Sequence, residues 1–268
     1  MSRLLALFIL AGLISTSCDD YNKLLKSSNY ELKLKRANEY FEKKNYIRAS
    51  QLYEELIPFV KGTERSEGVY YNYTWSEYNL GDYILSQYHF KNYTRQFPNG
   101  SHVEECYYMN AYCYYLNSPN YKLDQTNTRS AIKEFQSFID QFPESRRIDT
   151  SNILIDQLRG KIEHKDYEII RQYYRLEDWK ACITAAKNYL KEYPSSRYNE
   201  EMYYMIINSY YLLAVDSISS KKEERINSAI ENYQKFVDLY PTSSYLSRAE
   251  SIYKSSQKLK DNLSKNGF

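Results

Sequence analysis

The sequence predicts an all-α solenoid of five helix pairs followed by a capping helix. One observation behind this prediction is a short sequence motif that occurs four times. In it, an aromatic residue precedes proline and a residue with a hydroxyl group follows within three positions. Proline ends a helix because it lacks an N–H and clashes with the preceding turn, and the hydroxyl can cap the next helix. Composition agrees, since only seven glycines, six prolines and five valines among 268 residues disfavour a turn-rich β architecture. The four motifs span residues 97–101, 142–145, 193–196 and 240–243.

The second observation is a small residue twelve positions before each of these prolines, followed at plus four and plus seven by mostly aromatic residues. Positions i, i+4 and i+7 lie on one face of a helix, so each set predicts a buried face. A fifth copy, Ala49, Tyr53 and Leu56, precedes them, with Lys61 where the proline would stand. Five units that bury one another's faces predict one elongated domain. The other four sets are Ser86, Phe90 and Tyr93; Ala131, Phe135 and Phe138; Cys182, Ala186 and Tyr189; and Ala229, Tyr233 and Phe236.

The N-terminal residues have the features of a secretory signal. Arg3 precedes an apolar run over residues 4–14, which is too short to cross a bilayer of about 30 Å. Residues 15–18, Ser-Thr-Ser-Cys, resemble the lipobox of bacterial lipoproteins, although Ser15 stands where leucine is usual. This resemblance implies that Cys18 becomes the new N-terminus and carries acyl chains such as palmitate, which would anchor the chain to a membrane. The alternative is an ordinary signal that happens to end at a cysteine.

These observations divide the chain into four segments. A signal peptide covers residues 1–17, and a lipidated tether covers 18–28, whose polar residues reach at most about 35 Å when extended. The repeat domain covers residues 29–263, and a short tail covers 264–268.

The first two repeats have the clearest turn signals. Repeat one pairs helices over residues 30–43 and 46–60, with Asn45 able to cap the second helix. Repeat two turns near Gly81, which suits a left-handed backbone, and Asp82 can cap the helix that follows. The sequence therefore predicts tight interhelical turns in both repeats.

The third repeat contains the first predicted insertion. Its first helix spans residues 101–116, and Ser101 with Glu104 has the spacing of a capping box. Residues 117–127 form a polar stretch longer than an ordinary turn. Charged pairs such as Glu104 and Glu105 are adjacent on a helix and point in different directions, which predicts solvated faces rather than acid–base pairs.

The last repeats differ in length. Repeat four begins with an unusually long helix from residue 151 to about 176. Repeat five runs over residues 198–215, crosses a polar insertion at 216–222 and resumes at Glu223. Residues 245–263 form a sixth pairing helix, polar on one side, which predicts a solvent-facing cap.

The repeats resemble the tetratricopeptide family. Ala37 and Tyr40 precede Ala49 by twelve and nine positions, where that family places a small residue and an aromatic in its first helix. A narrower resemblance is carried by the lipobox, the five repeats of irregular length and residues 158–174, continuing through Trp179 and the 193–194 Tyr-Pro pair. Together these features resemble the BamD family of outer-membrane lipoproteins, which belong to the β-barrel assembly machinery.

The BamD resemblance implies a noncovalent function and named partners. Early repeats would receive unfolded outer-membrane proteins, later repeats would dock a BamA-like outer-membrane barrel protein, and other assembly lipoproteins could join. The chain would be lipid-anchored in the outer membrane and face the periplasm. The residues themselves leave open which precursors bind, the orientation and the composition of the complex.

Composition and motifs argue against other function classes. The formal net charge is +2 and charges alternate along the chain, so nothing indicates nucleic-acid binding. The three histidines lie in separate repeats without metal-type spacing, and no phosphate loop or serine elbow occurs, so the sequence predicts no enzyme, metal or cofactor. Cys106 and Cys113 lie seven positions apart on one helix, too far to pair, and are predicted to be core residues.

Eight residues are candidates for binding. Asn38 and Asn72 stand near positions where some tetratricopeptide proteins bind a ligand's terminal carboxylate, although Leu34 replaces the usual clamp lysine. Barrel precursors typically end in an aromatic residue, whose ring could contact nearby tyrosines and a tryptophan. Two solvated asparagines are the equally available alternative. The predicted substrate set is Asn38, Tyr40, Tyr71, Asn72 and Trp75, and the predicted partner-binding set is Arg171, Tyr174 and Arg197.

Two other functions stay open on the sequence. A tetratricopeptide lipoprotein could serve as a scaffold in another envelope complex, such as a secretion, gliding or peptidoglycan-linked assembly. A soluble periplasmic accessory protein or chaperone would require Cys18 to be unacylated. Co-purification of a barrel partner separates the first alternative from barrel assembly, and mass spectrometry of the mature N-terminus decides the second.

Overall fold

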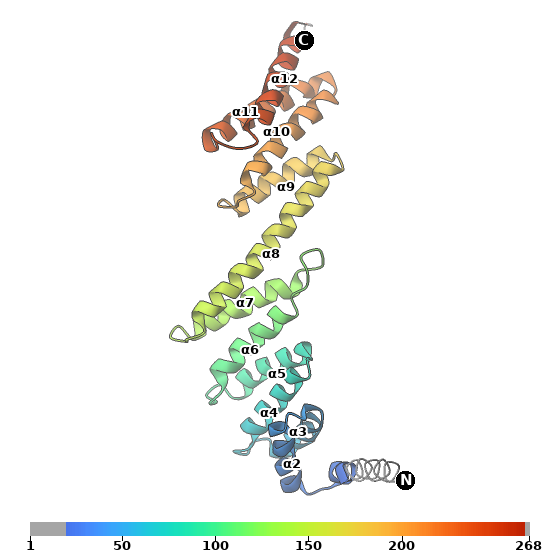
Figure 1. Cartoon of the computed structure of the whole chain (residues 1–268), viewed down its shortest axis with the longest axis vertical. Helices are drawn as coiled ribbons and strands as arrows, with labels where there is room; N and C mark the ends of the chain where they lie inside the picture. Colours follow the sequence, from blue (N-terminus) through green and yellow to red (C-terminus); the bar gives the residue numbers. More distant parts are fainter. Residues whose placement is uncertain (1–19, 266–268) are drawn as a thin grey trace, which may run out of the picture. The chain divides into compact units, whose positions relative to one another are not determined.

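The computed structural model describes residues 20–265, in which every regular element is a helix (Figure 1). The all-α prediction is therefore confirmed. The chain divides into two compact units, with the boundary between Leu158 and Arg159 inside the long helix α8. The labelled helices are α2 (Tyr30–Glu42), α3 (Tyr46–Val60), α4 (Ser66–Asn79), α5 (Tyr83–Gln96), α6 (Val103–Leu116), α7 (Thr126–Gln141), α8 (Ile148–Arg175), α9 (Trp179–Glu192), α10 (Asn199–Val215), α11 (Ser219–Leu239) and α12 (Leu246–Lys265).

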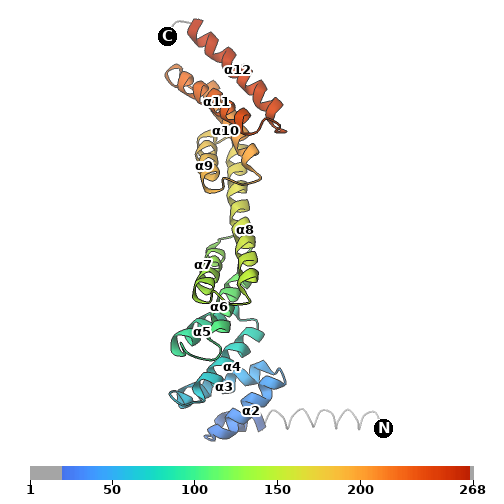
Figure 2. The ribbon, with the colours of Figure 1, turned by 90° about the vertical axis from the view of Figure 1, so that its left-hand side faces the viewer.

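Unit 1 is a series of helices in which each packs against the next, from α2 to α7. The second helix of each repeat carries one of the predicted small residues, and this small side chain lets a neighbouring helix pack closely against it. In the last part of the unit, Ala131 and Phe135 of α7 pack with Ile155 and Leu158 of α8. Figure 2 shows α7 beside this first half of α8. The first half of α8 therefore closes unit 1.

Unit 2 repeats this construction with the second half of α8. Tyr167 and Ile170 of α8 share a core with Cys182 and Ala186 of α9 and with Met202 of α10. Helix α11 packs on α10, and α12 packs on both α10 and α11. Helix α12 is thus the terminal helix of unit 2, as the sequence predicts for the cap.

The predicted small positions are confirmed as helix contacts. Ala49, Ser86, Ala131, Cys182 and Ala229 are all buried, with at most 1% of their surface exposed. The aromatic residues seven positions later are buried as well, among them Tyr93, Phe138, Tyr189 and Phe236.

The predicted turns are also confirmed. Asn45 and Asp82, the two predicted caps, each accept a hydrogen bond from the backbone N–H three residues later, and Asp178 caps α9 in the same way. Gly81 has a φ of +84°, and Glu177 has a φ of +59° at the turn between α8 and α9. The left-handed backbone is therefore required at both turns, although only one of them uses glycine.

Two local predictions are wrong. Ser101 and Glu104 form no capping box: the Ser101 hydroxyl donates to Glu67, and Glu104 accepts from Ser145 at 2.6 Å. Bonds between neighbouring repeats replace the local pair, and α6 begins only at Val103, without a side-chain cap. Helix α11 begins at Ser219, so it includes four residues that the sequence assigns to an insertion. Lys221 pairs with Glu224 at 3.3 Å, and this contact across three positions supports the first turn of α11.

The start of the described chain differs from the expected tether. Residues 20–26 form a short helix, and Tyr21 and Leu24 are buried in the core of the first helix pair. The tether is predicted because most residues of this segment are polar. Tyr21 and Leu24 are exceptions, and because they lie three positions apart they share one helix face. Cys18 and the signal segment lie outside the described residues.

Candidate functional site

Asn38 and Asn72, predicted to bind substrate, meet at the hydroxyl group of Tyr53. Tyr53 donates to Asn38 Oδ1 at 2.8 Å, and Asn72 Nδ2 donates to the Tyr53 hydroxyl at 3.2 Å. The Tyr53 side chain is fully buried, because it is the aromatic residue of the first repeat's predicted face. Both amides therefore satisfy a buried hydroxyl group, and any contact with a ligand would use their remaining polar atoms.

Tyr40 packs against the core cluster that contains Tyr53, and not against the cluster of Tyr71 and Trp75. Its ring packs edge-on against Tyr21, with 5.7 Å between the ring centroids, and Arg48 lies over both rings. Tyr71 and Trp75 belong to a different cluster, on α4. The structure thus separates the predicted set into an amide pair, Tyr40 and a Tyr71–Trp75 cluster.

The Tyr71–Trp75 cluster, which we call the unit 1 stack, is built from the start of two neighbouring repeats. The Tyr71 ring stacks on His102, with centroids 3.9 Å apart and an interplanar angle of 16°. Its hydroxyl donates to Glu105 Oε2 at 2.6 Å, and Trp75 packs edge-on against it at 6.2 Å. Burial, followed by the hydrogen bond with Glu105, raises the pKa of Tyr71, so the phenol stays protonated.

Glu105 connects this stack to a cation. Its Oε1 atom lies 3.3 Å from Arg147 Nη2, and the Arg147 guanidinium lies 4.7 Å above the Tyr108 ring. Glu104 is exposed, as predicted for a solvated face, whereas Glu105 is only partly exposed and accepts a hydrogen bond from a neighbouring repeat. In contrast, the buried indole N–H of Trp75 has no hydrogen-bond partner among residues 20–265.

Unit 2 contains an equivalent arrangement, which we call the unit 2 stack. The Tyr167 ring stacks on Tyr198, again with centroids 3.9 Å apart and an angle of 16°. The Tyr167 hydroxyl donates to Glu201 Oε2 at 2.7 Å, and burial followed by this hydrogen bond raises its pKa. Arg171 lies 5.4 Å from the Tyr167 ring, and Arg197 lies 4.8 Å from the Tyr198 ring. Two of the three predicted partner-binding residues therefore flank one pair of stacked rings.

The two stacks correspond residue by residue, since each position in unit 2 follows its counterpart by 96 residues. The stacked tyrosine and its carboxylate partner are identical in both, and the tyrosine and glutamate lie 34 residues apart in each. Trp75 corresponds to Arg171, and Ser101 corresponds to Arg197. Sequence patterns alone assign Tyr71 and Trp75 to one function and Arg171 and Arg197 to another, although they occupy equivalent positions in the two units.

Arg171 is held by carboxylates as well as by the ring. Its Nη1 atom lies 3.0 Å from Glu168 Oε1, and its Nε atom lies 3.7 Å from Glu201 Oε1. Arg197 is exposed, and its Nη2 atom donates to the Tyr198 hydroxyl at 2.6 Å. One cation of the unit 2 stack is therefore fixed by ion pairs, whereas the other reaches solvent.

Tyr174, the third predicted partner residue, lies on the same helical face as Tyr167 but contacts α9 and α10. Its ring packs edge-on against Trp179 at 5.6 Å, and its hydroxyl accepts a hydrogen bond from Asn208. Burial raises its pKa to about 12. The structure thus brings Arg171 and Arg197 to one pair of rings and places Tyr174 in a neighbouring packing contact.

Sequence patterns missed the groups that hold these stacks together. Glu67 accepts hydrogen bonds from Tyr93 and Ser101, and Glu163 accepts from Tyr189 and Ser196. The hydrogen bond from Tyr93, followed by that from Ser101, lowers the pKa of Glu67. The signal that could have revealed them is the recurrence of glutamate, tyrosine and proline at the same spacing of 96 residues.

A surface groove at the first helix pair was also missed. It has a volume of about 520 Å³ and lies beside the ring of Tyr30, which stacks on Phe59 at 3.9 Å. Phe59 is 56% exposed, which is unusual for so large an apolar side chain. No periodic signal marks it, because it lies off the buried face of α3.

Residues 20–265 contain no group of three or more histidine, cysteine, aspartate or glutamate side chains placed to hold a metal ion. Across the same residues, no helix combines the length and apolar character required to span a bilayer. The described cysteines, Cys106, Cys113 and Cys182, are buried thiols. Burial raises the pKa of Cys113 to about 12, which leaves its thiol protonated and unreactive.

The repeats can be compared with known proteins now that their geometry is described. The sequence model of the YfiO family, described as an outer membrane lipoprotein, matches residues 30–184 and 160–266. The chain belongs to the YfiO family. Membership supports a tetratricopeptide-type lipoprotein related to BamD and a location in the cell envelope. Both stacks lie within the matched residues.

Other comparisons add little. No curated protein matches the chain. Among solved structures, a human IFIT1 dimer with PPP-AAAA is similar at 14% sequence identity and a TM-score of 0.29. That match covers 85% of this chain, and the chain spans 57% of the length of the human protein.

Proposed function

We propose that this protein is a non-enzymatic, lipid-anchored subunit of the outer-membrane β-barrel assembly machinery. Its membership of a family of outer membrane lipoproteins supports the location. The observation that carries the binding role is the unit 2 stack, in which two arginines flank two stacked tyrosines. Tyrosine and arginine are, with tryptophan, the residue types enriched among those that dominate binding energy at protein interfaces.

In this proposal the unit 2 stack docks a BamA-like barrel protein. Exposed Arg197 offers a guanidinium group to a carboxylate or a backbone carbonyl of the partner, while its contact with Tyr198 limits the side-chain entropy lost on binding. Arg171 contributes its remaining N–H groups beside Tyr167. The partner surface that fits is a periplasmic domain with acidic or carbonyl groups.

Unit 1 is proposed to receive unfolded outer-membrane proteins. The Trp75 indole N–H lacks a partner among the described residues, and Tyr71 lies beside it. The groove beside Phe59 offers an exposed aromatic surface on the same unit. Aromatic precursor residues would pack on such rings, and the amides of Asn38 and Asn72 would contact the backbone with the atoms that Tyr53 leaves unused.

Co-purification from detergent-solubilised membranes tests the partner. The full chain should capture a BamA-like barrel protein, and the Arg171→Ala, Arg197→Ala double variant should lower the affinity by at least tenfold. Lys235→Ala with Lys254→Ala is the matched control, since both lysines are exposed in unit 2 and form only local ion pairs. Capture of an envelope complex without any barrel protein would support the scaffold alternative instead.

A peptide measurement tests the precursor site on the full chain. A peptide ending in phenylalanine should bind weakly, and Asn38→Ala with Asn72→Ala should reduce binding by a factor corresponding to roughly 1–3 kcal/mol. Equal binding of an amidated peptide ending in alanine would contradict recognition of the chain end.

The lipid anchor is tested separately. Cys18→Ala should release the protein into soluble fractions, because lipidation supplies stable membrane attachment in this proposal. Retention of the variant through high-salt and carbonate washes would contradict the anchor. Mass spectrometry of the mature N-terminus identifies the acyl chains directly.

A further inference from the structure

The helix over residues 20–26 is a fixed part of unit 1. Tyr21 and Leu24 are more than nine-tenths buried, and the Tyr21 hydroxyl donates to Gln51 Oε1 at 2.8 Å. The buried Lys33 ammonium donates to the backbone carbonyl of Leu25 at 2.7 Å and also pairs with Glu55. These hydrogen bonds connect the short helix to α2 and α3 through buried polar groups, so the helix has a specific docked position.

This docked helix limits the distance between the folded unit and the proposed anchor. Cys18 precedes Asp20 by two residues. Because consecutive Cα atoms are about 3.8 Å apart, the Cys18 Cα lies within about 7.6 Å of the Asp20 Cα. An acylated Cys18 would therefore hold the surface around Asp20 at the boundary between lipid and water.

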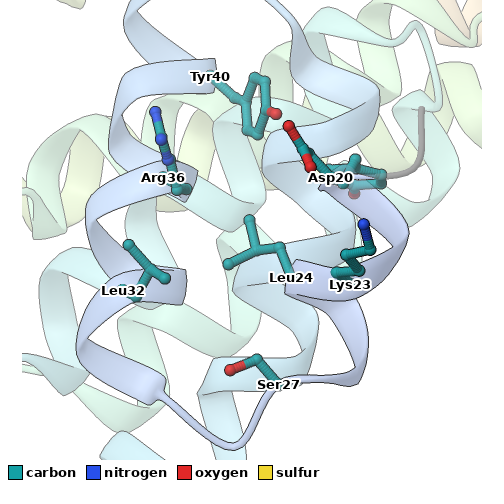
Figure 3. Close-up of a pocket in the computed structure, with 8 residues that line it drawn as sticks. Asp20, Lys23, Leu24, Ser27, Leu32, Arg36 and Tyr40 are labelled. Carbon is teal, nitrogen blue, oxygen red and sulfur yellow. The ribbon is translucent and has the colours of Figure 1, made fainter. Parts of the chain in front are cut away.

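A groove opens on this surface between the short helix and α2 (Figure 3). Its volume of about 670 Å³ lies within the range of ligand sites, roughly 300–1,000 Å³. Figure 3 shows Leu32, Arg36 and Tyr40 on α2, with Asp20 and Lys23 on the short helix opposite them. Arg36 Nη1 pairs with Glu39 at 2.7 Å and leaves more than half of its side chain exposed.

The groove is lined by two cations, Lys23 and Arg36, and by one carboxylate, Asp20, and the segment that forms it carries further positive charge. Residues 20–48 contain eight lysines and arginines and four aspartates and glutamates, a net charge of +4, whereas the whole chain carries +2. Basic residues near an anionic bilayer are each attracted to its surface. Positive charge is therefore concentrated in the part of the chain that the anchor would hold against the membrane.

We propose that this groove binds the phosphate-bearing headgroup of an anionic phospholipid in the bilayer that holds the acyl anchor. Arg36 and Lys23 contact the phosphate, and Leu32, which is 41% exposed, packs against the lipid glycerol. The first helix pair thus lies on the membrane surface rather than at the end of a flexible tether. The inference rests on the proposed acylation of Cys18.

Fluorescence of the acylated full chain in vesicles tests the groove. Leu32→Cys carries an environment-sensitive label, and Ile84→Cys is the matched control because Ile84 is an exposed apolar residue of the same unit. The native cysteines in the described range are buried and Cys18 is acylated in this design, so the label reports the introduced site. Spin-labelled lipid should quench the Leu32 label severalfold more than the Ile84 label, and equal quenching would overturn the proposal.

Vesicle composition tests the headgroup. Quenching at Leu32 should be at least twofold stronger with phosphatidylglycerol than with phosphatidylcholine alone, and Lys23→Gln with Arg36→Gln should abolish that difference. Lys235→Gln with Lys254→Gln should leave it unchanged. A charge variant that keeps the full difference would overturn headgroup binding.

Flotation of the protein with vesicles reports the lipid anchor independently of the groove. A protein that floats but gives no quenching difference at Leu32 contradicts only the groove proposal. A protein that does not float contradicts both the anchor and the groove.

Discussion

The unit 1 and unit 2 stacks have the same ring geometry but different flanking side chains. In both, a tyrosine stacks at 3.9 Å and donates to a glutamate 34 residues later. In unit 1 the flanking positions hold Trp75 and Ser101, whereas in unit 2 they hold Arg171 and Arg197. The shared tyrosine–glutamate bond joins neighbouring repeats, and the flanking residues give each unit its own surface.

This difference separates stability from recognition. A buried hydrogen-bonded ring stabilises the junction between repeats wherever it occurs. An exposed arginine adds little to stability, but it adds much to an interface that excludes water. Variants at the shared positions should therefore change folding, and variants at the flanking positions should change binding.

The chain has one tryptophan in each unit, which lets the two units be measured separately. Trp179→Phe leaves Trp75 as the reporter of unit 1, and Trp75→Phe leaves Trp179 as the reporter of unit 2. Urea unfolding in these two backgrounds supplies the free energies of unfolding for the variants below.

The largest effect is expected from removing the ring of the unit 2 stack. Tyr167→Ala should lower the stability of unit 2 by about 3 kcal/mol, because it removes a buried ring together with its hydrogen bond to Glu201. Tyr71→Ala in unit 1 should cost less, since the Tyr71 ring is more exposed; each glutamate keeps an arginine contact, Glu105 with Arg147 and Glu201 with Arg171. A larger loss in unit 1 would contradict the equivalence of the two junctions.

Overpacking the small helix contacts should have a similar effect in both units. Ala131→Phe and Ala229→Phe should each destabilise their unit by about 1–3 kcal/mol, because neither site has room for a ring. Ser137→Phe and Asn227→Phe place the same ring at exposed positions of the same helices and serve as controls. If each buried-site variant unfolds at the same urea concentration as its control, the repeat assignment is wrong.

Acid should weaken unit 1 through His89. Burial lowers the pKa of His89 to about 4, compared with about 6.5 in the unfolded chain. The unfolded state therefore binds the extra proton first, so stability falls as pH decreases from about 6.5 to about 4, by on the order of 2 kcal/mol. The equivalent position in unit 2 is Ala185. His89→Gln should reduce the pH dependence of the free energy of unfolding of unit 1, measured by Trp75 fluorescence. An unchanged pH dependence would mean that other groups cause the acid sensitivity.

The smallest change in stability is expected at the flanking arginines. Arg171→Gln should shift the free energy of unfolding of unit 2 by less than about 1 kcal/mol, and Arg197→Gln should leave the urea midpoint of unit 2 unchanged, because the two side chains are partly and fully exposed. The same variants should still weaken capture of the barrel partner. A stability loss as large as that of Tyr167→Ala would show that the arginines belong to the junction itself.

The sequence by itself determined the helices, their caps and the faces they bury. Asn45 and Asp82 cap helices through bonds to residues three positions away, and the small residues recur at a fixed distance from proline. These features depend on local geometry, so a periodic pattern is sufficient to predict them.

Only the tertiary structure decided which polar groups meet. Ser101 and Glu104 have the spacing of a capping box, yet each bonds to a different repeat. Tyr71 meets Glu105 because stacking brings residues 34 positions apart together, and Tyr21 is buried by residues far along the chain. Local spacing cannot choose between a nearby partner and a distant one of equal chemistry. Packing makes that choice, because it fixes which donor lies within about 3 Å of each carboxylate.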